Sequence, residues 1–212
     1  MPRFPRRLAV AGLFGLASCA GFAPLALAVD TATQTIVFLR HGEKPEAGLG
    51  QLSCQGLNRA LALPPVLTRL FGQPAVIFAP DPSKRKEDAG TSYDYVRPLA
   101  TIEPTAIALG LPVDTSFGYD DIDGLKAALE KPGYRGKLIF IAWEHKQIVD
   151  LARQLMHDNG GDAKAVPKWH GTDFDSFYVL RITRDGSKAS AAFEMLNEGL
   201  DGQPESCPHP AK

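Results

Sequence analysis

Two histidines and two arginines of this 212-residue chain are spaced in a way that suits oxyanion chemistry. Arg40 and His41 are adjacent, whereas Arg97 and His145 follow at long intervals. Arginine keeps its charge and offers paired N–H donors, so two arginines suit an anion with several oxygens, such as phosphate. A histidine among them can act as a nucleophile or carry a proton. The four residues predict an oxyanion site if the fold brings them together.

Predicted strands and helices alternate along the chain. Apolar, β-rich runs predict strands that are buried on both faces, as in a parallel sheet, at 35–39, 75–79 and 138–142. Helical spacing predicts helices at 56–71, 97–109, 124–130 and 147–157. Pro64-Pro65 is expected to break the first helix into two pieces, and Pro104 to kink or restart the second. Strands at 177–182 and 189–195 are expected to pair around Asp185-Gly186. The alternation predicts one α/β domain with a mostly parallel sheet.

The candidate residues stand where these strands end. Arg40-His41 follows the first strand, Glu144-His145 closes the third, and Arg97 opens the helix after the second. Ligands of open α/β sheets bind beyond the carboxyl ends of the strands, so all of these side chains are expected at one edge. The helix start at Arg97 is expected to add backbone N–H donors. The charged segment 84–88 is expected to be a solvated loop, with a substrate-contacting lid as the alternative.

Four features in this order resemble the histidine phosphatase superfamily, whose fold is the phosphoglycerate-mutase-like one. They are Arg40-His41-Gly42-Glu43 after a buried strand, the segment Leu52-Ser53 to Arg59-Ala60, the stretch 92–106 with Arg97 and Thr101, and His145 at the end of an apolar strand. The resemblance spans roughly 35–155 and implies a three-layer α/β/α fold. It also implies that His41 is the nucleophile that becomes phosphohistidine. Arg40, Arg97 and His145 would bind the phosphoryl oxygens, with no metal and no other cofactor.

The general acid is open among three carboxyl groups. The superfamily commonly places an acidic residue well beyond its second arginine, and Asp121 lies 24 positions after Arg97. Asp121 is therefore the first candidate and its neighbour Asp120 the second. Another branch places the acid after the second histidine, where this chain has Lys146. Glu144 is the third candidate, because a continued strand pleat would turn it away from His145.

The first 28 residues have the plan of a secretory signal peptide. Three arginines precede an apolar run, no acidic residue appears before Asp30, and Ala26-Leu27-Ala28 suits a cleavage site. Cleavage would leave one histidine-phosphatase-like domain at 29–212, periplasmic or secreted and free of the membrane. The alternative is a lipoprotein, since Leu16-Ala17-Ser18-Cys19 resembles a lipobox that would lipidate Cys19.

Charge and cysteine usage limit the possible partners. The formal net charge is −1, and removal of the three arginines leaves 20 basic and 24 acidic residues, hence −4, so no global basic field is available for a nucleic acid. Only Cys54 and Cys207 would remain after cleavage. In an oxidising compartment they are expected to form one disulfide that ties the C-terminal tail to the segment after the first strand.

The expected function is that of an exported phosphomonoesterase, a histidine acid phosphatase-type hydrolase of a small phosphorylated substrate. One alternative is a member of the same fold that binds a phosphorylated ligand with little or no turnover. A further alternative is a phosphomutase, which must keep its phosphoenzyme away from water. The identity of the substrate is not readable from the sequence.

Overall fold

A six-stranded sheet forms the centre of the computed structural model, which describes residues 31–208. The spatial order is β5-β2-β6-β1-β7-β8. The parallel strands are β1 (Ala32–Arg40), β2 (Val76–Phe78), β5 (Val113–Asp114) and β6 (Leu138–Trp143). The antiparallel strands at the other side are β7 (Ser176–Asp185) and β8 (Lys188–Asn197). The mostly parallel α/β sheet predicted from the sequence is confirmed.

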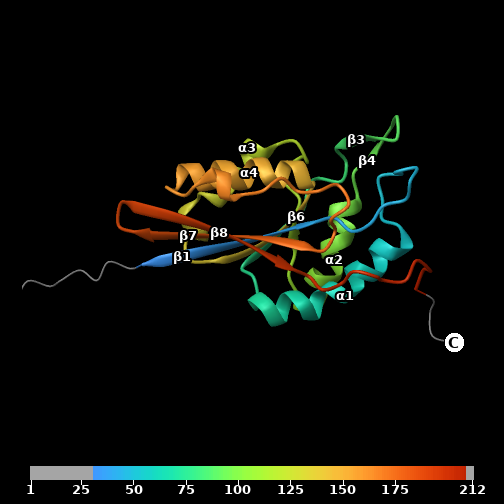
Figure 1. Cartoon of the computed structure of the whole chain (residues 1–212), viewed down its shortest axis with the longest axis horizontal. Helices are drawn as coiled ribbons and strands as arrows, with labels where there is room; N and C mark the ends of the chain where they lie inside the picture. The colour runs from blue at the N-terminus through green and yellow to red at the C-terminus, as the bar shows by residue number, and fades with distance from the viewer. Residues whose placement is uncertain (1–30, 209–212) are drawn as a thin grey trace, which may run out of the picture.

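Helices cover both faces of the sheet, which gives the expected three layers (Figure 1). One face carries α1 (Cys54–Phe71) and α2 (Arg97–Leu109), and the other carries α3 (Ile122–Leu129) and α4 (His145–Asp158). Short 3-10 turns lie at Pro132–Tyr134 and Ala163–Ala165. Among residues 31–208, no helix is both long and apolar enough to cross a membrane. The predicted signal peptide at residues 1–28 lies outside the described residues.

Strand β1 shows why its sequence is almost uninterruptedly apolar. Ile36 and Phe38 point into the core beneath α3 and α4, whereas Val37 and Leu39 point into the core beneath α1 and α2. All four side chains are fully buried. Successive residues of a strand face opposite sides, so a strand covered on both faces needs apolar residues at every position.

The predicted break of the first helix at Pro64-Pro65 and the predicted restart of the second at Pro104 are wrong. Helix α1 runs without interruption through Pro64 and Pro65, and α2 runs through Pro104. Each proline removes a backbone donor and disfavours an internal helical position. The buried face of α1 offsets this cost, since Leu63, Val66 and Leu67 all pack into the core around the prolines.

Segment 84–88 is a strand rather than the expected loop. Strand β3 (Arg85–Asp88) pairs with β4 (Thr91–Asp94) in a separate two-stranded sheet. Ala89 and Gly90 connect them with φ values of 52° and 80°, the pair of positive angles that suits a two-residue hairpin turn. The hairpin stands at the end of the molecule where β1 and β6 terminate (Figure 1). Its strands carry few apolar residues, so they show no apolar pattern that would predict a strand.

Candidate active site

Strands β1 and β6 end side by side and deliver Arg40 and His41 to the sheet edge. Arg40 is paired with Trp143 in the parallel register, and the His41 backbone N–H donates to the Trp143 carbonyl at 3.3 Å. The chain then turns at Gly42, where a Cβ atom would lie 2.9 Å from the Gly56 carbonyl oxygen of α1. Glycine is required at this close approach, which fixes the backbone immediately after His41.

His41 is held as a neutral imidazole with a defined free nitrogen. Its Nδ1 lies 2.8 Å from the Gly42 carbonyl oxygen, and because a carbonyl only accepts, Nδ1 is the protonated nitrogen. Nε2 therefore carries the lone pair. Burial, with the positive charge of Arg97 as the second cause, lowers the pKa of His41 to about 3. The side chain is thus unprotonated at neutral pH, as a nitrogen nucleophile must be.

Arg40 is fixed by the segment that precedes β7. Its Nη1 donates to the carbonyl oxygens of Gly171 and Asp173, both at 2.8 Å. The guanidinium lies 3.9 Å from the ring centre of Phe174, whose ring also neighbours that of His41 at 6.2 Å. Burial lowers the pKa of Arg40, although arginine remains charged in proteins. One face of Phe174 therefore helps to set the position of the cation beside His41.

Arg97 reaches the same site from the first residue of α2. Its Nη1 donates to Asp88 Oδ2 at 2.6 Å, and the guanidinium lies 4.9 Å from the ring centre of Tyr95. The Tyr95 ring in turn meets the His41 ring edge-on at 6.1 Å. Lys44 also pairs with Asp88. Burial alone would raise the pKa of Asp88, but Lys44 and Arg97 outweigh it and lower that pKa.

The first two positions of α2 offer no free backbone donor. The Arg97 N–H already donates to the Gly50 carbonyl at 3.0 Å, and Pro98 has no N–H. The helix contributes through Thr101 instead. Thr101 Oγ1 accepts from the Gly42 N–H and donates to the Arg97 carbonyl, both at 2.9 Å. One hydroxyl thus ties α2 to the turn after His41.

Glu144 lies on the same side as His145, which corrects the expected pleat. Strand β6 ends at Trp143, and Glu144 caps α4 by accepting from the N–H groups of Lys146 and Gln147 at 2.9 and 3.0 Å. Its Oε1 lies 3.0 Å from His145 Nδ1. Burial would raise the pKa of Glu144, but the His145 contact and the backbone N–H groups outweigh it and lower that pKa to about 2. The side chain is an anion at neutral pH.

Buried donors without partners concentrate at this site. Within residues 31–208, the buried side-chain polar atoms that make no hydrogen bond include Arg40 Nε, Tyr95 Oη and Arg97 Nε, all at this site. Leaving a buried polar group unsatisfied typically costs about 1–3 kcal/mol, and more when it is charged. A multi-oxygen anion is the chemical group that could satisfy two arginines together.

The structure leaves the roles of Asp121 and Asp120 as predictions. Asp121 is exposed and caps α3, where its Oδ1 accepts from the Gly124 N–H at 3.0 Å. Asp120 is also exposed. Among the described residues, neither carboxyl forms a hydrogen bond or ion pair with His41 or His145.

Sequence reasoning missed four side chains that surround the site. Tyr95 and Phe174 pack on His41, and Asp88 holds Arg97, as described above. The fourth is Lys86, whose Nζ lies 4.6 Å from the ring centre of Tyr119 and 5.9 Å from that of Tyr95. All four belong to polar or irregular segments without periodicity, so only the charge of segment 84–88 could have drawn attention to two of them, Lys86 and Asp88.

Glu43 and Arg59 form a structural cluster rather than part of the anion site. Arg59 is buried in α1 and contacts four carboxylates, those of Glu43, Asp175, Glu198 and Asp201, at 2.7 to 3.1 Å. Burial alone would lower the pKa of Arg59, but the hydrogen bond to the Glu43 carboxylate outweighs it and raises that pKa. The cluster joins the loop after His41 to the C-terminal segment.

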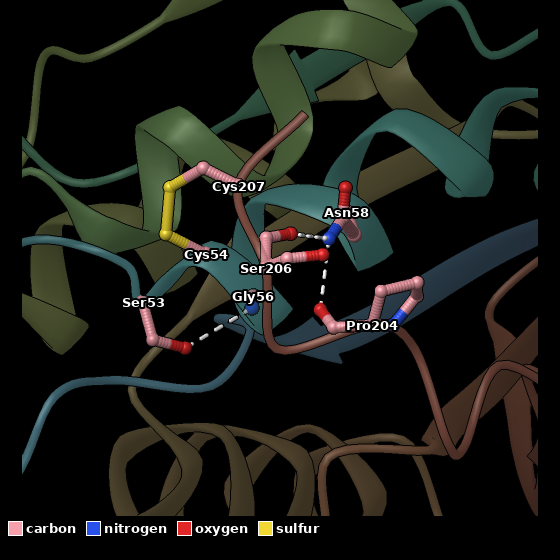
Figure 2. The surroundings of a disulfide bond; sticks show 7 residues. All are labelled: Ser53, Cys54, Gly56, Asn58, Pro204, Ser206 and Cys207. Atoms are coloured by element: carbon pink, nitrogen blue, oxygen red, sulfur yellow. Dashed lines mark hydrogen bonds between the residues drawn. A yellow bond between two sulfur atoms is a disulfide. The ribbon is translucent and has the colours of Figure 1, made fainter. Parts of the chain in front are cut away.

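Cys54 and Cys207 form the predicted disulfide, with their Cα atoms 4.5 Å apart across 153 positions of sequence. Figure 2 shows the tail crossing the first turn of α1, where Asn58 Nδ2 donates to the carbonyls of Pro204 and Ser206, both at 2.8 Å. Ser53 caps the same turn by accepting from the Gly56 N–H. Gly56 is the residue against which Gly42 packs, so the bridge stands close to the turn that positions His41.

Comparison of the fold with solved structures agrees with the resemblance seen in the sequence. A mycobacterial glucosyl-3-phosphoglycerate phosphatase in complex with inorganic phosphate aligns with a TM-score of 0.53 and 16% identity, covering 77% of this chain and 97% of that one. A phosphoglycerate mutase from Plasmodium falciparum aligns with a TM-score of 0.50 and 12% identity, covering 85% and 99%. No family model and no curated protein matches the sequence.

Both neighbours are histidine phosphatase superfamily members, so this chain has the phosphoglycerate-mutase-like fold. At these identities the comparison concerns the fold, and the chemistry must be argued from the site. Among residues 31–208, no group of three or more His, Cys, Asp or Glu side chains is arranged to hold a metal ion.

Proposed function

We propose that the protein is a phosphomonoesterase that works through a phosphohistidine at His41. The observation that carries the proposal is the neutral His41, with Nε2 free, beside unpartnered buried donors of Arg40 and Arg97. A nucleophile next to two fixed cations is the arrangement that phosphoryl transfer needs, because charge develops on the oxygens around phosphorus.

The proposed reaction has two steps at one nitrogen. His41 Nε2 attacks phosphorus, a phosphorus–nitrogen bond forms, and the bond to the leaving oxygen breaks. That oxygen takes up a proton and departs as the alcohol. Water then attacks the phosphohistidine, the phosphorus–nitrogen bond breaks, and inorganic phosphate leaves with His41 restored. Arg40, Arg97 and His145 bind the phosphoryl oxygens in both steps.

The proton for the leaving group is assigned to Asp121, with Asp120 as the second candidate. Glu144 suits this role poorly, because a pKa of about 2 leaves it without a proton at neutral pH. Its capping contacts and its contact with His145 suit an orienting role instead.

One observation favours the alternative of a member that binds phosphoryl groups without efficient turnover. Asp121 is exposed and is engaged as a helix cap, and among the described residues no carboxyl group forms a hydrogen bond or ion pair with His41. Catalytic contacts often tighten only with substrate bound, and turnover of a phosphoester decides between the two functions.

Export is part of the proposal. The Cys54–Cys207 disulfide suits an oxidising compartment, and the arginine-led apolar segment at the N-terminus suits a secretory signal. The mass of the protein recovered from the periplasm or medium tests this. Cleavage after Ala28 is expected, and a lipid-modified species beginning at Cys19 would support the lipoprotein alternative instead.

The nucleophile is tested with His41→Ala and the exposed control His157→Ala. We expect the wild type to hydrolyse an activated aryl phosphate and to trap an acid-labile phosphate label. His41→Ala should lose the label and nearly all turnover, while circular dichroism stays unchanged. His157 lies at the far end of α4 with its side chain 82% exposed, so that variant should retain both. A labelled His41→Ala protein would contradict the mechanism, and a wild type without turnover would favour the binding function.

A further inference from the structure

A pocket of about 500 Å³ opens beside the proposed phosphoryl site. Helix α4 and the segment after it form its walls, which include His145, Lys146, Asp150, Arg153, Lys168 and Trp169. This volume falls within the range of sites for small organic molecules, about 300–1,000 Å³, and far exceeds what one phosphoryl group needs.

Two residues connect the pocket directly to the phosphoryl site. His145 lines the pocket and is also a predicted ligand of the phosphoryl oxygens. Gly171 lines it too, and its carbonyl accepts the 2.8 Å hydrogen bond from Arg40 Nη1. A substrate whose phosphoryl group sits on Arg40 and His145 would therefore extend its remaining part into this pocket.

The pocket is rich in positive charge and has firm walls. Lys146, Arg153 and Lys168 line it against one carboxylate, that of Asp150. Arg153 is fixed by two hydrogen bonds to the Val166 carbonyl, from Nε at 3.1 Å and Nη2 at 2.9 Å. Trp169 is buried and stacks on Tyr178 with 4.1 Å between ring centres. The excess of cations is local, since the whole chain carries a formal charge of −1.

We propose that this pocket binds a second anionic group of the substrate, a carboxylate or a second phosphate carried on the alcohol part of the phosphomonoester. The inference rests on the proposed function and narrows its substrate class to esters with two separated anionic groups. Lysine and arginine side chains form charge-assisted hydrogen bonds with both kinds of anion. A neutral alcohol could not form such charge-assisted hydrogen bonds.

The test compares alkyl phosphates that differ only at the far end of the chain, which carries a hydroxyl, a carboxylate or a second phosphate. Each is prepared with short and with longer methylene spacers, so that reach and charge are separated. We expect the wild type to prefer one or both series with an anionic end group over the hydroxyl series by about tenfold or more in kcat/KM at low salt. Added salt should reduce that preference. The better of the two anionic series identifies the anion.

Lys168→Ala and the control Lys164→Ala locate the effect. Both lysines are exposed and lie in the same segment, but only Lys168 lines the pocket. Lys168→Ala should raise KM for the preferred anionic ester by about five- to tenfold and leave the hydroxyl ester unchanged, whereas Lys164→Ala should change neither.

Two failures are distinguishable. Equal kcat/KM for all end groups, or an equal effect of Lys168→Ala on charged and neutral esters, would overturn the second-anion pocket while the phosphatase function stands. A wild type that hydrolyses none of the esters, nor an aryl phosphate, would overturn the proposed function and this inference with it.

Discussion

His41 is neutral because it is buried and because a cation that would bind its substrate lies beside it. Burial is the larger cause of its lowered pKa, and the positive charge of Arg97 is the second. A cation placed to receive phosphoryl oxygens thus also prevents the neighbouring imidazole from taking a proton. The Gly42 carbonyl then selects which nitrogen is free. One constellation therefore supplies both the binding charge and an active nucleophile.

The pH dependence of kcat/KM follows from this state. Because the pKa of His41 is lowered to about 3, its protonation should not limit activity near pH 6.5, where an ordinary histidine titrates. Any acidic limb near pH 6 should come from the second ionisation of the phosphate ester, which lies at about 6. Two aryl phosphates with different second ionisation constants check this. The limb should move with the substrate, and a limb near pH 6.5 shared by both would contradict a neutral, buried His41.

The leaving-group acid is the least settled residue, and substrate chemistry can assign it. An alkyl oxygen must be protonated as it departs, whereas a nitrophenolate leaves unaided. If Asp121 donates the proton, Asp121→Asn should slow the alkyl ester more than the nitrophenyl ester, by a factor of about 10²–10⁴. Glu144→Gln should lower both rates alike, because it removes an anion that orients His145. The opposite pattern would move the acid to Glu144.

For single residues, the sequence predicted which residues form the site better than it predicted where their side chains point. Arg40, His41, Arg97 and His145 were found because each stands at a strand end or helix start. The orientation of Glu144 was predicted wrongly, because the strand stops at Trp143 and a cap replaces the pleat. The switch from strand to helix cap occurs where β6 stops pairing with β1, and a single sequence does not show that point.

The β3–β4 hairpin is the element that completes the site from outside the central sheet. It carries Asp88 to Arg97 and directs Lys86 toward the rings of Tyr95 and Tyr119. Lys86 also contributes to the lowered pKa of Glu144, which places its charge within electrostatic reach of the His145 side of the site. The hairpin thus holds Arg97 in place through Asp88 and adds the positive charge of Lys86.

Lys86 is expected to assist substrate binding rather than the chemical step. Lys86→Ala should raise KM about three- to tenfold with little change in kcat, because a partly buried cation near the site attracts the phosphoryl dianion. Lys84→Ala removes the same charge from an exposed position of the same segment and is the matched control. Steady-state kinetics at low and high salt measure the effect. A loss in kcat with unchanged KM, or equal effects of both variants, would show that the hairpin does not contact substrate.

The strands that could be predicted are those whose burial produces a recognisable run of apolar residues in the sequence. Strands β1, β2 and β6 are covered on both faces and carry continuous apolar runs, so their positions were predicted within a few residues. The hairpin has a separate two-stranded sheet and few apolar side chains, and β5 contributes only two residues. The prolines had the opposite effect, since they predicted interruptions where the helices are continuous. Tertiary packing of α1 and α2 outweighs the local preference of proline.

At the scale of the whole molecule, the C-terminal segment is fastened to the helix that supports the site. The disulfide joins it to the first residue of α1, and Asn58 holds two of its carbonyl groups (Figure 2). Arg59 then contacts carboxyl groups from the loop after His41, from the segment before β7 and from the segment after β8. A bridge across so long a loop can stabilise the fold by a few kcal/mol. The tail therefore belongs to the framework that fixes the turn at Gly42.

The Arg59 cluster should make stability fall between about pH 4.5 and 8. Burial raises the pKa of Glu198 from its ordinary 4.5 to about 8, although Arg59 opposes the rise. In this window the unfolded chain has lost the proton that the folded protein keeps, so raising the pH favours unfolding. Each pKa unit corresponds to about 1.4 kcal/mol, and the total should be on the order of a few kcal/mol.

Glu198→Gln isolates this contribution, because its neutral amide keeps an acceptor for Arg59 without a titrating proton. His41 has the opposite sign, since its lowered pKa makes stability rise with pH below about 6.5, and the informative quantity is therefore the difference between variants. Urea unfolding of the oxidised protein at pH 5 and pH 8.5 measures it. Relative to wild type, Glu198→Gln should gain stability at pH 8.5 compared with pH 5. Glu205→Gln, exposed on the same tail, should match wild type at both. A Glu198→Gln protein that follows the wild type at both pH values would show that Glu198 is already ionised in the folded state.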